Sequence, residues 1–122
     1  MFGNYFEGKR VLVTGVSGVK GTWLALMLLD AGAIVTGLDK RVAALRSNFT
    51  ATGLAGRINF VLGDVRDLAL VRRLIEESDC IFHLAAEAIV GEAARDPLEA
   101  YSSNTLGTAT VLESLRLVGS PK

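Results

Sequence analysis

The chain has 122 residues, half of them hydrophobic, and its 13 Lys and Arg balance its 13 Asp and Glu. These values favour one globular domain over 1–122, exclude a disordered chain, and argue against a nucleic-acid partner because there is no basic excess. No apolar run approaches the roughly 20 residues that cross a membrane, no signal peptide is recognisable, and the single cysteine excludes an internal disulfide, so we expect a cytoplasmic protein without a membrane partner.

The first predicted strand, about 10–14, leads into a glycine-rich turn. The strand is apolar and β-branched, and Gly15, Gly18 and Gly21 follow it at intervals of three. In this setting the first glycine permits the turn, the second lets a pyrophosphate approach the backbone, and the third lets helix and strand pack closely. A helix that begins at Lys20 would offer its N-terminal N–H groups to the phosphates. Strand, turn and helix in this order predict a dinucleotide site.

The helix over 20–31 is followed by a second strand, 33–38, that ends at an acidic residue. We expect the helix to bury an apolar stripe against the sheet: Trp23, Leu24, Met27, Leu28 and Ala31. Asp39 lies about two dozen residues after the first glycine, near the spacing at which a carboxylate meets the adenosine ribose. It would accept hydrogen bonds from both ribose hydroxyls and repel a 2′-phosphate, which favours NAD. Lys40 and Arg41 could hold that phosphate, so NADP is the alternative, and a solvated loop aspartate is the structural alternative.

A short helix and a turn are expected over 41–56, before a third strand at 59–62. Asp64 follows this strand and could accept a hydrogen bond from the adenine amine, with Val65 against the ring. Asp67 would then cap the next helix. In the alternative interpretation, either aspartate serves only as a helix cap.

The fourth strand, 80–84, is followed by the small residues Ala85 and Ala86, which would let a ribose and nicotinamide pass over the strand end. His83 at that end is more typical of a structural residue than of a catalytic base. Cys80 and His83 are three positions apart on a strand and point to opposite faces, so they predict no metal site.

The last helix begins at Asp96 and Pro97, a favourable N-cap followed by proline in the first turn, and ends near Val118. Its expected buried stripe consists of Leu98, Tyr101, Thr105, Ala109, Leu112 and Leu115. Asn104 lies beside that stripe and needs a hydrogen-bond partner. Gly107 would permit close approach to the sheet.

Strands that alternate with helices imply a parallel sheet with right-handed crossovers. The ordered motifs are Thr14-Gly15-x-x-Gly18-x-x-Gly21, Asp39, Gly63-Asp64-Val65-x-Asp67, His83-Leu84-Ala85-Ala86 and Asn104-x-x-Gly107-Thr108. Together they resemble the extended short-chain dehydrogenase/reductase family over nearly the whole chain, and more narrowly the NAD-dependent nucleotide-sugar epimerases and 4,6-dehydratases. The stretches 6–24 and 95–98 are similar to CDP-glucose 4,6-dehydratase, whereas 90–92 is similar to UDP-glucose 4-epimerase, so both enzyme classes stay open.

The resemblance implies a Rossmann-like, three-layer α/β fold with four parallel strands in the order 3-2-1-4, lacking the later strands, and NAD as the cofactor. By this resemblance, Gly15, Ser17, Gly18, Val19 and Lys20 line the pyrophosphate, with Gly21 completing the turn; Asp39 and Lys40 meet the adenosine ribose; Asp64 and Val65 meet the adenine; and Leu84, Ala85, Ala86 and Asn104 lie along the middle and nicotinamide side.

The resemblance also implies catalysis by a tyrosine whose pKa a nearby lysine lowers, from a Tyr-x-x-x-Lys helix after a fifth strand. Tyr5 and Lys9 have this spacing but lie in a segment that runs into a strand, and Tyr101 has Thr105 four residues on. We therefore assign no catalytic residue and expect an NAD-binding portion that is inactive alone, or alternatively a stand-alone binding or assembly module. Either would leave 80–84 as an apolar sheet edge, for which we predict self-association.

Overall fold

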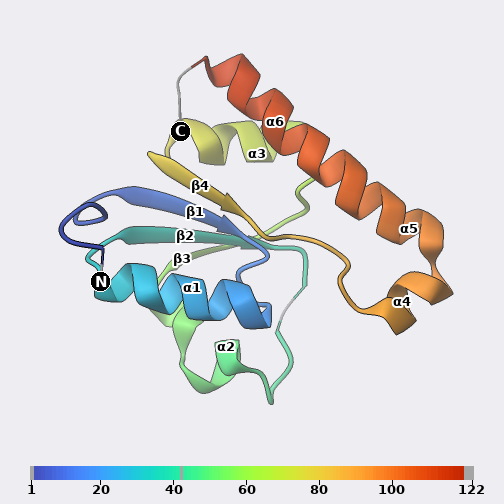
Figure 1. Ribbon diagram of the computed structural model, residues 1–122, viewed down its shortest axis with the longest axis horizontal. Coiled ribbons are helices and arrows are strands. Elements are labelled where there is room, and N and C mark those ends of the chain that lie inside the picture. Colours follow the sequence, from blue (N-terminus) through green and yellow to red (C-terminus); the bar gives the residue numbers. More distant parts are fainter. Residues whose placement is uncertain (1, 42, 120–122) are drawn as a thin grey trace.

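The computed structural model describes residues 2–41 and 43–119 and contains one sheet with helices on both faces (Figure 1). The strands are β1 (Arg10–Thr14), β2 (Ile34–Asp39), β3 (Asn59–Leu62) and β4 (Cys80–His83). All three neighbouring pairs are parallel, in the order β3-β2-β1-β4. The predicted 3-2-1-4 order of a Rossmann-like fold is therefore confirmed.

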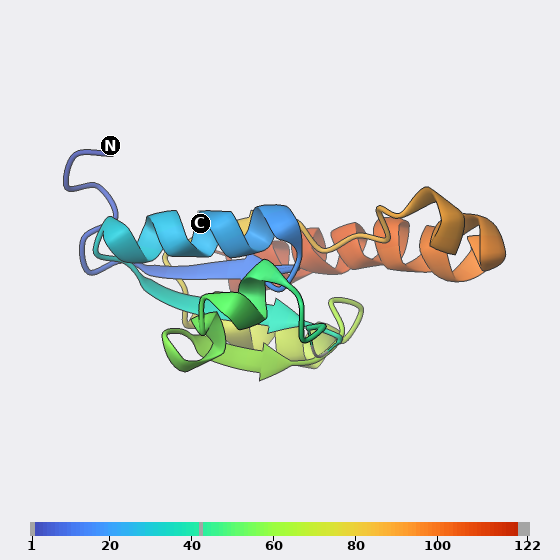
Figure 2. The same ribbon diagram turned by 90° about the horizontal axis from the view of Figure 1, so that it is seen from below.

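The helices form the two outer layers. They are α1 (Val19–Asp30), α2 (Asn48–Ala51), α3 (Leu68–Glu76), α4 (Val90–Arg95), α5 (Pro97–Tyr101) and α6 (Gly107–Val118), with a 3₁₀ turn η1 (Leu54–Gly56) and a π-helical turn η2 (Ser102–Leu106). α1 and α2 cover one face of the sheet and α3 and α6 the other, while α5, η2 and α6 run on as one rod that carries α4 and α5 beyond the strands (Figures 1 and 2). Within the described ranges, every helix is too short or too polar for a membrane span.

β1 lies at the centre of the core because it has a strand on each side. Val11 and Val13 pack into the cluster beneath α1, and Leu12 packs into the cluster beneath α3 and α6. By contrast, all four residues of β4 are only half-buried, since β4 pairs with β1 alone. β4 is therefore a sheet edge within the described chain.

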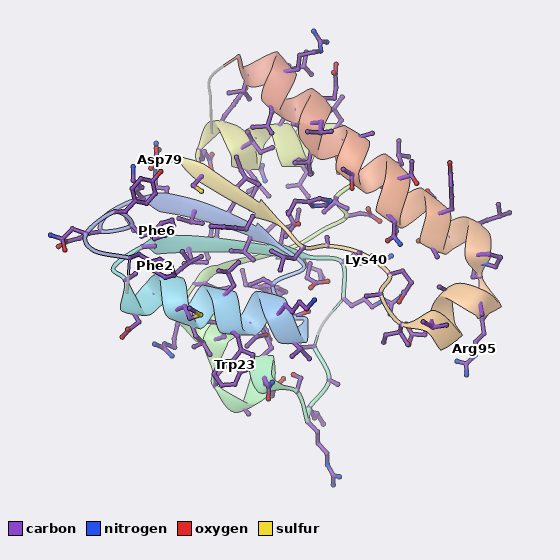
Figure 3. The ribbon with its side chains drawn as sticks, viewed as in Figure 1. Phe2, Phe6, Trp23, Lys40, Asp79 and Arg95 are labelled. Carbon is purple, nitrogen blue, oxygen red and sulfur yellow. The ribbon has the colours of Figure 1, made fainter. Side chains whose placement is uncertain are left out.

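The apolar stripe predicted on α1 is wrong. The buried residues of α1 are Gly21, Thr22, Ala25 and Leu28. Trp23, which we expected in the core, is 54% exposed and Met27 is 38% exposed (Figure 3), while Leu24 and Ala31 are half-buried. The reason is the close approach of α1 to the glycine turn: a Cβ on Gly21 would overlap the carbonyl oxygen of Gly15, so only small side chains fit between.

The stripe predicted on the last helix is also wrong for most of its members. Leu98, Tyr101, Thr105, Ala109 and Leu112 are exposed. The buried residues are instead Ala100, Ser103, Gly107, Thr110, Val111 and Ser114. A Cβ on Gly107 would come within 2.7 Å of the Val65 side chain, so this glycine allows close approach to the segment after β3 and not to the sheet itself.

Two predicted helix starts are confirmed by their caps. Asp67 Oδ1 accepts a hydrogen bond from the Leu70 N–H at 3.1 Å, at the start of α3. Asp96 Oδ1 accepts one from the Glu99 N–H at 3.1 Å, with Pro97 as the first residue of α5. α4 was not predicted, because its six residues bury no side chain and so carry no apolar pattern.

Candidate functional site

A cavity of about 920 Å³ lies at the carboxyl ends of β1, β2 and β4. Ligands of open α/β sheets bind at this end, where the strand order reverses. Most residues predicted to bind the cofactor line the cavity: Gly15, Ser17, Gly18, Val19, Lys20, Gly21, Asp39, Lys40, Val65, Leu84, Ala85 and Ala86. Asp64 and Asn104 do not line it.

Two glycines of the turn are required by the packing of the protein itself. Gly15 has φ +69°, and a Cβ there would lie 2.8 Å from the backbone nitrogen of Ala85. Its N–H donates to the Leu38 carbonyl at 2.8 Å, which fixes the end of β1 beside β2. Gly21 meets the same turn from α1, as described above. Both positions therefore need glycine whether or not anything occupies the cavity.

Gly18 is different, because no part of the protein requires a glycine there. Its φ is −69°, and a Cβ would make only an ordinary contact, 3.4 Å from the Gly15 carbonyl oxygen. Gly18 is also the N-cap of α1 and provides no side-chain hydrogen bond, whereas side chains cap α2, α3 and α5. The first N–H groups of α1 can therefore bind an anion in the cavity.

Asp39 supports the glycine turn with one oxygen. Oδ2 accepts hydrogen bonds from the Ser17 N–H at 3.1 Å and the Ser17 Oγ–H at 2.6 Å. Oδ1 has no hydrogen-bond partner among the described residues. Asp39 is thus a fixed residue of the cavity wall with acceptor capacity to spare, unlike a solvated loop aspartate.

Lys20, Lys40 and Arg41 are the cations that line the cavity. Lys40 Nζ lies 3.3 Å from Glu99 Oε1, between the strand ends and α5 (Figure 3). Arg41 lies 3.5 Å from Glu87 and 3.4 Å from Glu92. Within the described residues Lys20 has no ion-pair partner, so its charge is available to a ligand.

Asp64 is held by Arg66. Its Oδ1 accepts from the Arg66 N–H at 2.9 Å and Nε–H at 3.0 Å, and its Oδ2 accepts from Nη2–H at 2.6 Å. These hydrogen bonds lower the pKa of Asp64. Arg66 also donates to Glu99 at 2.9 Å and to Ser102 Oγ at 3.0 Å, so it joins the segment after β3 to the α5–η2 rod.

His83 lies in a hydrogen-bond chain with a defined direction. Thr14 Oγ1 accepts from the N–H groups of Leu84 and Ala85, both at 3.1 Å. These two bonds use both lone pairs of the hydroxyl, so its hydrogen is donated to His83 Nδ1 at 2.7 Å. His83 Nε2 then carries the proton and donates it to Thr108 Oγ1 at 3.1 Å. Burial lowers the pKa of His83, and the ring is a structural link between β1, β4 and α6.

Asn104 acts on the rim of the cavity through Glu87. Its Oδ1 accepts from the Glu87 N–H at 2.7 Å, and its Nδ2 donates to the Glu87 carbonyl at 3.2 Å. Thr108 Oγ1 donates to the Asn104 carbonyl at 2.8 Å, so the chain from His83 continues to this residue. The partner that the sequence required for Asn104 is therefore the backbone after β4.

Tyr5 and Lys9 lie in the turns before β1, at the opposite end of the sheet from the cavity. Lys9 Nζ lies 4.7 Å from the centre of the Tyr5 ring, so they form a local contact away from the site. Among residues 2–41 and 43–119, no group of three His, Cys, Asp or Glu side chains could hold a metal ion.

Several lining residues were not singled out from the sequence: Ala43, Ala44, Ser47, Gly63, Glu87, Ala88, Ile89, Glu92 and Ser103. Those at 87–92 directly follow the predicted segment 84–86, and the same strand-end rule extends to them. Ser103 has no such signal, because it reaches the cavity from a helix distant in sequence.

Comparisons with known proteins agree with this site. A family model described as GDP-mannose 4,6-dehydratase matches residues 12–122. CDP-glucose 4,6-dehydratase of Salmonella typhimurium is 39% identical over 98% of this chain and 34% of its own length. UDP-glucose 4-epimerase of Halalkalibacterium halodurans is 34% identical over 86% of this chain and 30% of its own length. The chain thus spans about a third of these relatives.

Solved structures show the same arrangement of strands and helices. Epimerase Mth375 of Methanothermobacter thermautotrophicus superposes with a TM-score of 0.77 at 33% identity, covering 95% of this chain and 34% of that one. UDP-glucose 4-epimerase of Thermus thermophilus, solved as a complex with NAD, superposes with a TM-score of 0.74 at 32% identity, covering 90% of this chain and 34% of that one.

Proposed function

The chain belongs to the GDP-mannose 4,6-dehydratase family, and from this premise we propose that it is the N-terminal, NAD-binding portion of a nucleotide-sugar 4,6-dehydratase or epimerase. Residues 1–122 would form one dinucleotide-binding domain. Support comes from similar epimerases of Thermus thermophilus and Brucella ovis, whose structures are complexes with NAD.

The observation that carries this proposal is the cavity wall at Gly18. The protein has room for a Cβ at this position, so the absence of a side chain matters only to a ligand that approaches the backbone. The uncapped N-terminus of α1 meets Lys20 at the same place, and Lys20 has no ion-pair partner among the described residues. Small size, free N–H groups and a positive charge suit a pyrophosphate.

The remaining roles follow from the cavity wall. Asp39 would use its second oxygen for the adenosine ribose, and Val65 would lie against the adenine. Asp64 would need the lone pair that Arg66 leaves on Oδ2 to accept from the adenine amine. Asn104 would act by holding the backbone of Glu87. When bound, NAD would supply a hydride acceptor for the sugar.

Titration calorimetry with NAD tests the proposal. We expect the wild type to bind and Gly18→Ala to lose roughly tenfold or more in affinity, since the added methyl group would occupy the place of the pyrophosphate. Asp39→Ala should also weaken binding, because it removes the ribose acceptor and the support of Ser17.

The matched control is Asp30→Ala, at the exposed far end of α1, which should bind NAD like the wild type. Thermal melts should show that Gly18→Ala remains folded, as its spacious surroundings predict. Equal heats in the wild type and both site variants, or no heat in any of them, would reject the cofactor site.

We further propose that the chain alone does not turn over nucleotide sugars, because neither Tyr5 nor Tyr101 forms a tyrosine–lysine pair at the cavity. Absorbance at the wavelength of reduced nicotinamide should stay constant with NAD and UDP- or CDP-glucose. A stand-alone binding or assembly module is the second candidate. It is distinguished by whether the reading frame continues into a Tyr-x-x-x-Lys segment.

The predicted self-association also stays a proposal. It rests on the half-buried residues of β4, whose outer side has no neighbouring strand within the described chain. Unpaired sheet edges of this kind pair with other chains. A cytoplasmic location remains a prediction from composition alone.

A further inference from the structure

We propose that Glu87, Glu92 and Glu99 set a preference for NAD over NADP by occupying the two cations beside the adenosine ribose. This inference rests on the proposed function. Lys40 and Arg41 directly follow Asp39 and are the residues that could otherwise bind the 2′-phosphate of NADP. The three glutamates come from the segment after β4, from α4 and from α5.

Each cation has a carboxylate partner. Lys40 Nζ is 3.3 Å from Glu99 Oε1, and its side chain is only 29% exposed. Arg41 lies between Glu87 at 3.5 Å and Glu92 at 3.4 Å. A 2′-phosphate would have to displace carboxylates that are already present.

These carboxylates are fixed in position. The Glu87 side chain is 13% exposed, and both polar groups of its backbone are bonded to Asn104. Glu99 accepts hydrogen bonds from Arg66 at 2.9 and 3.1 Å. A partner that is held in place keeps its charge near the cation when a ligand arrives.

The charge balance differs between the two ends of the cavity. Around the ribose, Asp39 and the three glutamates outnumber the two cations, which leaves a net negative charge. At the glycine turn, Lys20 is unpaired among the described residues. The cavity therefore attracts phosphate where NAD and NADP both carry it and repels phosphate where only NADP does.

The test compares NAD and NADP affinities by calorimetry at low salt in the wild type and in Glu87→Gln/Glu92→Gln/Glu99→Gln. Glutamine keeps the shape and removes the charge. We expect the ratio of the NADP to the NAD dissociation constant to fall roughly tenfold, and the change to shrink at high salt. The exposed single variant Glu92→Gln should change the ratio in the same direction by less.

Glu113→Gln is the charge-matched control, because Glu113 pairs with Arg116 on α6 and should leave the ratio unchanged. Adding Arg41→Ala to the triple variant should reverse most of the gain for NADP. A wild type that binds NAD, with an unchanged ratio in the triple variant or a gain that survives Arg41→Ala, overturns this inference alone. A wild type that binds neither nucleotide overturns the proposed function and this inference with it.

Discussion

Gly15 and Gly21 sit where an added Cβ would meet backbone atoms, whereas Gly18 faces open space. We expect Gly21→Ala to destabilise the chain by about 3 kcal/mol or more, since the helix must move away from β1 and disturb the core. Urea unfolding followed by far-ultraviolet circular dichroism measures this change in the free energy of unfolding.

Gly56→Ala is the matched control, because a Cβ at Gly56 meets nothing within 4 Å and its φ is not positive. It should change the free energy of unfolding by less than about 1 kcal/mol, in either direction. A Gly21→Ala variant as stable as Gly56→Ala would contradict the close contact between α1 and the turn.

His83 gives the stability a dependence on pH. Burial lowers its pKa from the ordinary 6.5, and the Thr14 hydroxyl donates to Nδ1, so protonation favours the unfolded chain. The stabilising effect is therefore complete above pH 6.5 and is lost as the pH falls toward the lower pKa of the folded protein. The free energy of unfolding should be smaller at pH 5.5 than at pH 7.5.

His83→Gln, which cannot titrate, provides the comparison. The chain contains one histidine, and histidine is the side chain that ordinarily titrates between these pH values. We expect the difference in stability between pH 7.5 and 5.5 to be reduced in the variant. The same difference in both proteins would show that the ring is not held neutral.

At the level of residues, the sequence predicted most of the cavity wall because strand ends, glycines and an acidic residue carry local signals. It did not predict the partners of Lys40 and Arg41. Glu99 and Glu92 lie more than fifty residues along the chain from their cations, and only the course of the rod past the strand ends brings them there.

Among the elements, the α5–η2 segment is anchored to the loop after β3 by Arg66. Arg66→Ala should remove its contacts with Glu99 and Ser102 and weaken the anchoring by about 1–2 kcal/mol. Amide hydrogen exchange over 97–106 should then accelerate roughly 5- to 30-fold. Mass spectrometry of the exchanged peptides measures this rate.

Arg72→Ala is the control, since Arg72 pairs with Glu76 within α3 and should leave exchange over 97–106 unchanged. Arg66 lowers the pKa of both Asp64 and Glu99. Anchoring should therefore be complete above their ordinary pKa values of 3.8 and 4.5 and be lost as the pH falls through the lower values of the folded protein. Slow exchange that survives the loss of Arg66 would assign the anchoring to other contacts.

The elements themselves were more predictable than their buried faces. Strand positions and the caps at Asp67 and Asp96 depend on local chemistry. The faces of α1 and α6 depend on distances between layers, and close packing selects Ala25, Thr110 and Ser114 where larger residues such as Trp23 would not fit. A sequence pattern that weighs size and apolarity alone selects the outer side.

For the molecule as a whole, the β4 edge and the exposed residues of the rod are two separate apolar surfaces. We expect size-exclusion chromatography with light scattering, under reducing conditions, to find dimers or larger species. Cys80→Lys, which places a charge on the edge, should favour the monomer. Leu112→Lys, on the rod and 61% exposed in the wild type, should have little effect.

A wild type that remains monomeric at high concentration would reject the predicted association. Dimers that persist in Cys80→Lys but dissociate in Leu112→Lys would move the contact from the sheet edge to the rod.

The exposed position of Trp23 has an optical consequence. It is the only tryptophan of the chain, and it stands on the outer side of the helix that begins at the glycine turn. Its emission in the folded protein should already resemble that of an indole in water, so fluorescence will report unfolding weakly. The same indole can transfer excitation to a reduced nicotinamide ring, which makes it an intrinsic donor for detecting the bound dinucleotide without a label.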